Sequence, residues 1–220
     1  MKKEKNSNSR RNFIKKSATL TLTTGSLLTV PQLSKANQTP TISQNDSINY
    51  IGPKEGYTPQ IGTLVSMMNW MRSTILRPVQ GMSVKDLDYL HDDNSNSIGA
   101  MLWHLAATER FYQVNTFEGK RWGSWDKKDR VEFSIAMSLG NVGRAKIKGH
   151  DLDFYLEKLN RVREHSLKEL AKRDDEWLLK TDPDWMWNEP TNNYCKWFHV
   201  VEHESNHNGQ IKFIKSRVPS

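Results

Sequence analysis

Four stretches of the chain repeat apolar residues at steps of three and four, and this period restricts each of them to an amphipathic α-helix with one buried face. In the first stretch, Ile61, Leu64, Met68, Met71 and Ile75 form the buried stripe. The four predicted helices cover residues 61–78, 97–116, 151–173 and 191–215. Because the sequence shows no convincing strand and no internal repeat, it predicts an all-α protein built as a four-helix bundle.

Two segments between the predicted helices carry no clear period. Residues 121–149 contain several glycines and mixed polarity, which indicates a long connection with some helix or a short strand pair. The loop after the third helix is rich in aromatic residues, including Trp177, Trp185 and Trp187. We expect this loop to cover one end of the bundle.

The positive charge of the chain is concentrated at its N-terminus. The 220 residues carry a formal net charge of +7, from 32 Lys and Arg against 25 Asp and Glu. Residues 1–36 hold eight of the basic residues and one of the acids, which leaves 24 of each sign in the remainder. The body of the protein is therefore formally neutral, and its charge gives no reason to expect a nucleic acid as a partner.

Residues 1–36 have the organisation of an export signal. The motif Ser-Arg-Arg-Asn-Phe-Ile-Lys at residues 9–15 is similar to the core of twin-arginine signals. A mildly apolar stretch follows at residues 18–30, and Ser34, Lys35 and Ala36 supply small residues around a cleavage site. The apolar stretch is too short to span a bilayer, which takes about 20 residues.

The signal predicts export through the twin-arginine machinery to the periplasm or the cell exterior, with a mature chain that starts near Asn37 and has no stable membrane insertion. A disordered basic tail, or a membrane anchor if cleavage fails, is the alternative. Substrates of the twin-arginine machinery cross the membrane in the folded state, often with a metal already bound. Residues 37–57 are a predicted polar linker, and residues 58–217 are the predicted domain. The single cysteine, Cys195, excludes an intrachain disulfide.

Three histidines lie on buried faces of the predicted helices. His203 and His207 follow Val200 on one stripe of the fourth helix, about 40° apart at about 100° per residue. His104 lies on the buried stripe of the second helix. An unsatisfied buried imidazole costs about 1–3 kcal/mol, whereas one divalent ion satisfies several at once. The pattern therefore favours a metal site over core histidines that bind backbone carbonyls or water.

His203, Glu204 and His207 also match the H-E-x-x-H pattern of zinc metalloproteases. Those enzymes take their third ligand from a residue further along the chain. The thirteen residues after His207 contain no His, Asp, Glu or Cys, so we disfavour a protease. Glu204 is then either a carboxylate at the edge of the stripe or a residue that orients a metal ligand.

Three other side chains of the fourth helix lie near the histidine pair in sequence. His199 is about 80° from His207, at the edge of the stripe, and we do not expect it to bind the ion. Glu202 points to solvent. Cys195 precedes His203 by eight residues, about 12 Å along a continuous helix, which is too far to share its ion.

Two runs of sequence resemble the signatures of the DinB/YfiT-like superfamily and its DUF664-type members. They are SIGAMLWHLAATERFYQ at residues 97–113 and HVVEHESNHNGQIKFI at residues 199–214, and the resemblance extends over residues 58–217. It implies an up-down-down-up four-helix bundle that holds one divalent ion, zinc or nickel, through His104, His203 and His207. The family pattern requires neither His199 nor Cys195, and a packed thiol is the interpretation we favour for Cys195.

The first hypothesis for the function is a metal-dependent enzyme, because three histidines leave a coordination position open for water or substrate. Relatives include thiol S-transferases and isomerases, so a hydrolase or a thiol transferase acting on an unidentified small molecule is expected. Export argues against the transferase, because small thiols are chiefly cytoplasmic. The alternatives are a non-catalytic metal-binding or interaction module of the cell envelope, and a purely structural bundle. The sequence identifies no catalytic residue. It is compatible with a homodimer.

Overall fold

The computed structural model describes residues 47–183 and 189–219, all of which belong to one compact unit. The described helices are α1 (Pro59–Val79), α2 (Val84–Leu87), α3 (Ile98–Thr116), α4 (Lys127–Ser138), α5 (Gly140–Lys146), α6 (Leu152–Leu170), α7 (Asp175–Leu179) and α8 (Asn193–Lys215). Strand β1 (Thr181–Asp182) pairs antiparallel with β2 (Thr191–Asn192). None of these helices is both long and apolar enough to cross a membrane.

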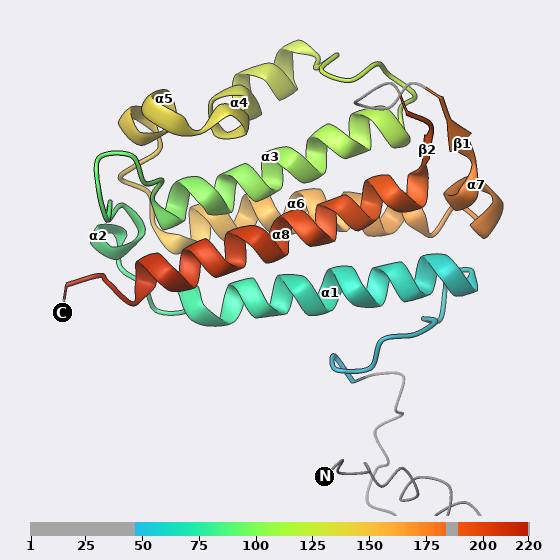
Figure 1. Ribbon diagram of the computed structural model, residues 1–220, viewed down its shortest axis with the longest axis horizontal. Helices are drawn as coiled ribbons and strands as arrows, with labels where there is room; N and C mark the ends of the chain where they lie inside the picture. The colour runs from blue at the N-terminus through green and yellow to red at the C-terminus, as the bar shows by residue number, and fades with distance from the viewer. Residues whose placement is uncertain (1–46, 184–188, 220) are drawn as a thin grey trace, which may run out of the picture. The chain divides into compact units, whose positions relative to one another are not determined.

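Four long helices form the bundle, as the sequence predicts. Helices α1 and α8 run in one direction, and α3 and α6 run in the other (Figure 1). Helix α3 packs against α6 and α8, and α1 packs against α8. The order along the chain is therefore up-down-down-up, and the prediction of an all-α four-helix bundle is confirmed.

The long helices begin at capped residues. The Ser97 hydroxyl accepts from the Ala100 amide at the start of α3, and the Asp151 carboxylate accepts from the Phe154 amide at the start of α6. The sequence predicts both starts. The N-terminus of α1 has no side-chain cap of its own, and Asp175 of α7 accepts from the first amides of α1 instead. A residue far along the chain thus fixes the start of the first helix.

The connections between the helices are more ordered than predicted. The segment 121–149 contains two helices, α4 and α5, and no strand, and α4 packs along α3. Trp177 lies in α7 rather than in a loop, where its ring stacks on Phe117 at 5.8 Å between centroids. Trp185 and Trp187 lie outside the described residues.

The start of α8 and the end of α6 also differ from the prediction. Thr191 belongs to β2, where it pairs with Asp182, so α8 begins two residues later behind an Asn192 cap. No strand is predicted at these positions, because a two-residue pair is too short to produce an alternating pattern. Helix α6 ends at Leu170, three residues before the predicted end.

Four charged side chains meet inside the bundle, one from each long helix. Arg72 of α1 and Arg163 of α6 bind Glu109 of α3 and Glu204 of α8, at nitrogen–oxygen distances of 2.5–2.9 Å. We call these four residues the buried charge quartet. No member is more than 7% exposed, and the two positive charges balance the two negative ones. Such a group stays buried only because each charge has its partners.

The guanidiniums of the quartet also bind backbone carbonyls of the facing helix. Arg72 Nη1 donates to the Leu159 carbonyl at 3.1 Å, and Arg163 Nη1 donates to the Met68 carbonyl at 2.8 Å. Burial raises the pKa of the Glu109 carboxyl, but Arg163 and Arg72 outweigh burial and hold this pKa below its usual range. The four long helices are therefore joined by one connected set of charge-assisted hydrogen bonds.

Candidate metal centre

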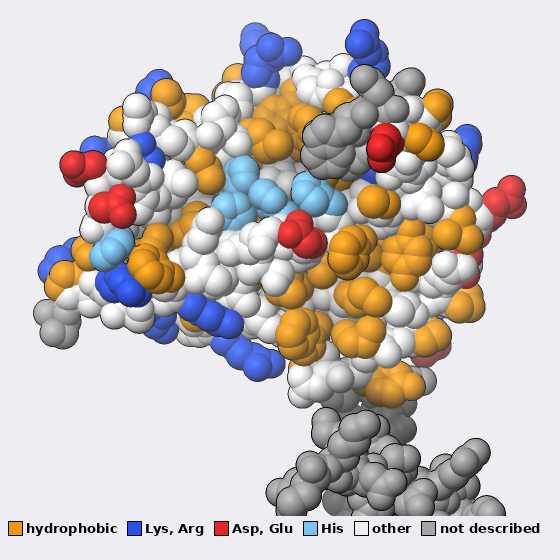
Figure 2. Space-filling view, in the orientation of Figure 1, with side chains coloured by type: hydrophobic (Ala, Val, Ile, Leu, Met, Phe, Trp, Pro, Cys, Tyr) orange, Lys and Arg blue, Asp and Glu red, His pale blue; other side chains and the backbone are white. Residues whose placement is uncertain are grey.

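His104, His203 and His207 come together where α3 and α8 cross the same face of the bundle. One ligand atom of each residue lies within 4.8 Å of the others, and the Nε2 atoms of His104 and His203 are 2.9 Å apart. His104 and His207 are buried, and His203 is half-buried. Figure 2 shows histidine side chains at the surface in a hollow bordered by hydrophobic side chains. The three imidazoles that the sequence selected therefore form one cluster with access to solvent.

Helix α4 orients the first of these imidazoles. His104 Nδ1 donates to the carbonyl of Ala136 at 2.9 Å, because a carbonyl oxygen can only accept. The neutral ring therefore keeps its lone pair on Nε2, the atom that faces His203. Neither the position of α4 nor this role is predicted from the sequence, since a backbone carbonyl gives no signal in a sequence.

Two polar side chains stand beside the cluster. Gln210 Oε1 accepts from His207 Nδ1 at 2.8 Å, which leaves the Nε2 lone pair of this ring free for a ligand bond. The Thr108 hydroxyl lies 3.4 Å from His203 Nε2 and 3.5 Å from His104 Nε2. Thr108 lies on the buried stripe of α3, and no role for it at the site is predicted from the sequence. Its place one turn after His104 on that stripe was the available signal for a role at the site.

The environment keeps all three imidazoles neutral. Burial lowers the pKa of His104 to about 4, and repulsion from His207 adds to this effect. Burial also lowers the pKa of His203 to about 3, with further contributions from the other histidines around it. Burial lowers the pKa of His207, although the hydrogen bond that this ring donates to Gln210 acts in the opposite direction. Neutral imidazoles are the form that binds metal ions.

The donor set and its spacing fit a divalent transition-metal ion. Two imidazole nitrogens on one tetrahedral zinc ion, each at ~2.0–2.1 Å, would be about 3.3 Å apart. The observed 2.9 Å between His104 Nε2 and His203 Nε2 differs from this by a few tenths of an ångström. No other His, Cys, Asp or Glu joins the group among the described residues. Three histidines leave at least one coordination position for water or a substrate.

Comparison with known proteins identifies the family. The family model of mycothiol-S-transferase matches residues 63–218, most of the chain. The chain belongs to the mycothiol-S-transferase family. This family is DinB/YfiT-like and metal-associated, so the resemblance noted in the sequence is confirmed.

A comparison with solved structures concerns the fold. The crystal structure of a conserved protein from Enterococcus faecalis matches with a TM-score of 0.55 at 12% identity, over 70% of this chain and 94% of that chain. At this identity the likeness shows the fold alone. No sequence among curated proteins matches the chain.

In this member of the mycothiol-S-transferase family, His199 lies outside the cluster. Its Nδ1 forms a short hydrogen bond with the Tyr112 hydroxyl, and its Nε2 lies 3.8 Å from a Glu202 carboxylate oxygen. Cys195 is exposed, which corrects the expectation of a packed thiol. It lies in the first turn of α8, where the side chain is on the outer face.

Glu204 corrects a second expectation. It is neither an edge carboxylate nor a hydrogen-bond partner of a histidine, because it is 2% exposed and binds Arg72 and Arg163. Glu204 lies only about 40° from Val200 around α8, so it shares the buried arc. The two histidines of α8 consequently lie toward one edge of this arc, which explains why they reach the surface hollow.

Proposed function

We propose that His104, His203 and His207 bind one divalent ion, zinc or nickel, and that the protein is a metal-dependent S-transferase for mycothiol or another small thiol. The observation that carries this proposal is the cluster of three neutral imidazoles, open to a surface hollow, in a chain of the mycothiol-S-transferase family. A closed structural site would instead supply a fourth protein ligand.

In the proposed reaction the thiol loses its proton to solvent, its sulfur bonds to an electrophilic carbon, and the displaced group leaves with its electron pair. A divalent ion in the site would lower the pKa of the thiol and hold the sulfur in its reactive, deprotonated form. The protein's own residues set the geometry. The carbonyl of Ala136 and the amide oxygen of Gln210 fix the rings of His104 and His207. The Thr108 hydroxyl can donate a hydrogen bond to a group held beside the rings.

The site of action is part of the proposal. We infer that the protein is exported through the twin-arginine machinery to the periplasm or the cell exterior, because residues 9–15 match the signal motif. This motif favours the second candidate, a non-catalytic metal-binding module of the envelope, because small thiols are chiefly cytoplasmic. The S-transferase and the envelope module should bind the same amount of metal, but only the S-transferase should convert a substrate.

The test measures both properties on the full chain. Zinc- and nickel-loaded samples are analysed for bound metal, and then assayed with mycothiol and chlorodinitrobenzene for the conjugate and the released chloride. We expect about one ion per chain and a conjugation rate that His203→Ala abolishes. A full metal complement with no conjugation would overturn the transferase and favour the envelope module. Ester hydrolysis without any thiol would indicate a hydrolase.

A further inference from the structure

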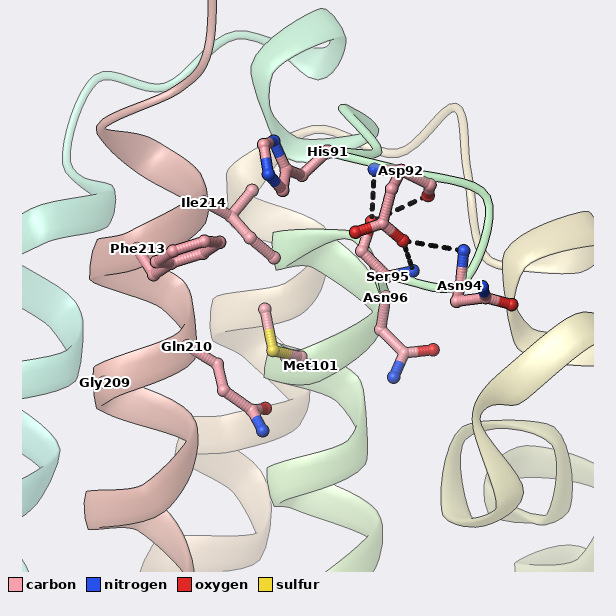
Figure 3. Close-up of a pocket in the computed structure, with 10 residues that line it drawn as sticks. All are labelled: His91, Asp92, Asn94, Ser95, Asn96, Met101, Gly209, Gln210, Phe213 and Ile214. Carbon is pink, nitrogen blue, oxygen red and sulfur yellow. Dashed lines mark hydrogen bonds between the residues drawn. The ribbon is translucent and has the colours of Figure 1, made fainter.

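A pocket of about 480 Å³ adjoins the histidine cluster at one end of the bundle. The loop of residues 91–96 forms one wall, the first turn of α3 forms the floor, and the last turns of α8 form the other wall (Figure 3). Pockets of this size bind small organic ligands. The volume therefore has ample room for a molecule with an aromatic ring and a short substituent.

Two residues join the pocket to the cluster. Gln210 lines the pocket and accepts the hydrogen bond of His207 Nδ1 at 2.8 Å. Met101 also lines it and precedes His104 by three residues, one turn earlier on the same face of α3. A ligand that fills the pocket consequently has its inner end beside the imidazoles.

Two carboxamides present N–H groups at this inner end. Asn96 Oδ1 accepts from the Gly140 amide at 3.2 Å, and Gln210 Oε1 accepts from His207. These bonds fix which end of each carboxamide is the oxygen. The Nδ2 group of Asn96 and the Nε2 group of Gln210 have no protein partner among the described residues. Figure 3 shows the two carboxamides on either side of Met101, both directed to the same edge of the pocket.

The rest of the lining combines apolar side chains of α3 and α8 with polar side chains of the 91–96 loop, including the imidazole of His91. Met101 and Ile214 are at most 4% exposed and form a fixed apolar surface, beside the half-exposed ring of Phe213. The Oδ1 atom of Asp92 accepts from the amides of the two residues that follow Asp93. The lining residues include no Lys or Arg. The guanidiniums of Arg217 and Arg144 lie outside the lining, where they contact the Phe213 ring and the Asn94 carbonyl. The carboxylate of Asp92 within the lining therefore disfavours a carboxylate ligand relative to a neutral one.

We propose that this pocket binds the electrophilic co-substrate, and that its chemical class is a small uncharged molecule with an apolar or aromatic body and a carbonyl oxygen. The body packs on Met101, Phe213 and Ile214, and the oxygen accepts from Asn96 Nδ2 and Gln210 Nε2. The assignment of this ligand as the sulfur acceptor rests on the proposed S-transferase function. The recognition of a neutral carbonyl compound does not.

The test uses three probes of equal shape and different chemistry. Acetophenone carries the carbonyl, α-methylstyrene replaces its oxygen by a methylene group, and benzoate adds a negative charge. Each is titrated into the full chain, zinc-loaded and chelator-treated, while the side-chain amide signals of Asn96 and Gln210 are followed by NMR. We expect acetophenone to shift both signals in both samples, and to bind about five-fold or more tighter than α-methylstyrene, the effect of one or two neutral hydrogen bonds.

Matched variants locate the donor. Asn96→Asp keeps the oxygen that accepts from the Gly140 amide and removes the N–H donor. The affinity for acetophenone should therefore fall about five-fold or more, whereas the affinity for α-methylstyrene should not change. Asn160→Asp makes the same change on the exposed face of α6, away from the pocket, and should leave both affinities unchanged. Asn160→Asp therefore shows how much one added negative charge alone changes the ligand affinities.

Three results would overturn the proposal: equal affinity for acetophenone and α-methylstyrene, tighter binding of benzoate, or binding that leaves the Asn96 and Gln210 signals in place. Selective binding of acetophenone together with an absence of metal or of conjugation would reject the S-transferase and retain the pocket's recognition of carbonyl compounds. The S-transferase function and the recognition of carbonyl compounds by the pocket can therefore be rejected independently of each other.

Discussion

His199 and His207 lie at equal distances in sequence from His203, four residues to either side on α8, yet they have different partners. His207 joins the cluster, whereas His199 binds the Tyr112 hydroxyl. We therefore expect His207→Ala to reduce the metal stoichiometry of the purified protein sharply, because two nitrogen ligands hold an ion weakly. His104→Ala should act in the same way.

His199→Ala is the matched control for this prediction, since it removes an imidazole from the same helix. It should leave the metal content of the protein unchanged. A loss of metal from His199→Ala equal to that from His207→Ala would show that the helical register of the site is wrong. Elemental analysis after dialysis measures the stoichiometry.

The lowered pKa values of the cluster predict how the metal-free protein responds to acid. Below pH 6.5 the unfolded chain takes up protons on His104 and His203, whereas the folded chain does so only near pH 4 and pH 3. Because the unfolded state binds more protons in this window, the free energy of unfolding falls as the pH falls. From pH 7.5 to pH 5 we expect a loss on the order of 1–2 kcal/mol per histidine.

Urea denaturation of chelator-treated protein at pH 7.5 and pH 5 measures this loss. His203→Gln removes one of the titrating groups, so the variant should lose less free energy of unfolding over the same interval than the wild type. An equal loss in both proteins would mean that His203 is not held neutral in the folded state. Paired carboxylates such as Glu109 titrate below this window and do not contribute to it.

At the scale of the elements, the buried charge quartet fixes how the long helices pack. Glu204→Leu removes one negative charge and leaves Arg72 and Arg163 with a single carboxylate in the interior. We expect this change to lower the free energy of unfolding by about 3–5 kcal/mol. Arg72→Met together with Glu204→Leu leaves a neutral pair, and the double variant should be more stable than Glu204→Leu alone.

Chemical denaturation of the two single variants and the double variant completes a thermodynamic cycle for this pair. Effects of Arg72→Met and Glu204→Leu that simply add would contradict a direct coupling between the two side chains. A loss of unfolding free energy in the double variant that is smaller than the sum of the two single losses would support this coupling.

Helices α3 and α6 approach closely at a glycine. A Cβ atom at Gly99 would lie 2.6 Å from the hydroxyl of Tyr155, whose ring is fully buried. Gly99→Ala should therefore lower the free energy of unfolding by about 1–2 kcal/mol, because overpacking exceeds the helix-propensity gain of about 1 kcal/mol. Gly209→Ala on α8 meets no atom within 4 Å and should be neutral or stabilising. Thermal unfolding of both variants compares them, and equal shifts would contradict the close approach.

These elements show what a sequence can predict and what it cannot. The helical period located His104, His203 and His207, and the polar residues Ser97 and Asp151 marked two helix starts, because both signals are local. The burial of Glu204 was missed, since the pattern of apolar residues does not reveal a charge whose partners lie on other helices. The contribution of α4 to the site was missed for a similar reason: it acts through a backbone carbonyl, and its weakly periodic segment gave no position.

At the scale of the whole molecule, the proposed export signal leads to a prediction that is independent of the fold. Arg10→Lys with Arg11→Lys keeps the charge of residues 1–36 and removes the arginine pair. We expect the double variant to accumulate in the cytoplasm with an unchanged circular dichroism spectrum, whereas the parent chain is recovered outside it, cut near Asn37. Normal export of the variant by the same route would reject the twin-arginine assignment. Cell fractionation and N-terminal sequencing measure both outcomes.

The quartet also has a consequence for the order of events during synthesis. Glu204 is carried by α8, the last of the four bundle helices in chain order, and before α8 is made the nascent chain holds two guanidiniums and a single carboxylate for the same interior. A three-helix intermediate would have to bury an excess positive charge or keep its centre hydrated. The interior can therefore close only after α8 has been synthesised and can supply Glu204. Chains truncated before Glu204 should remain open to proteases, and a separately made α8 peptide should restore their resistance.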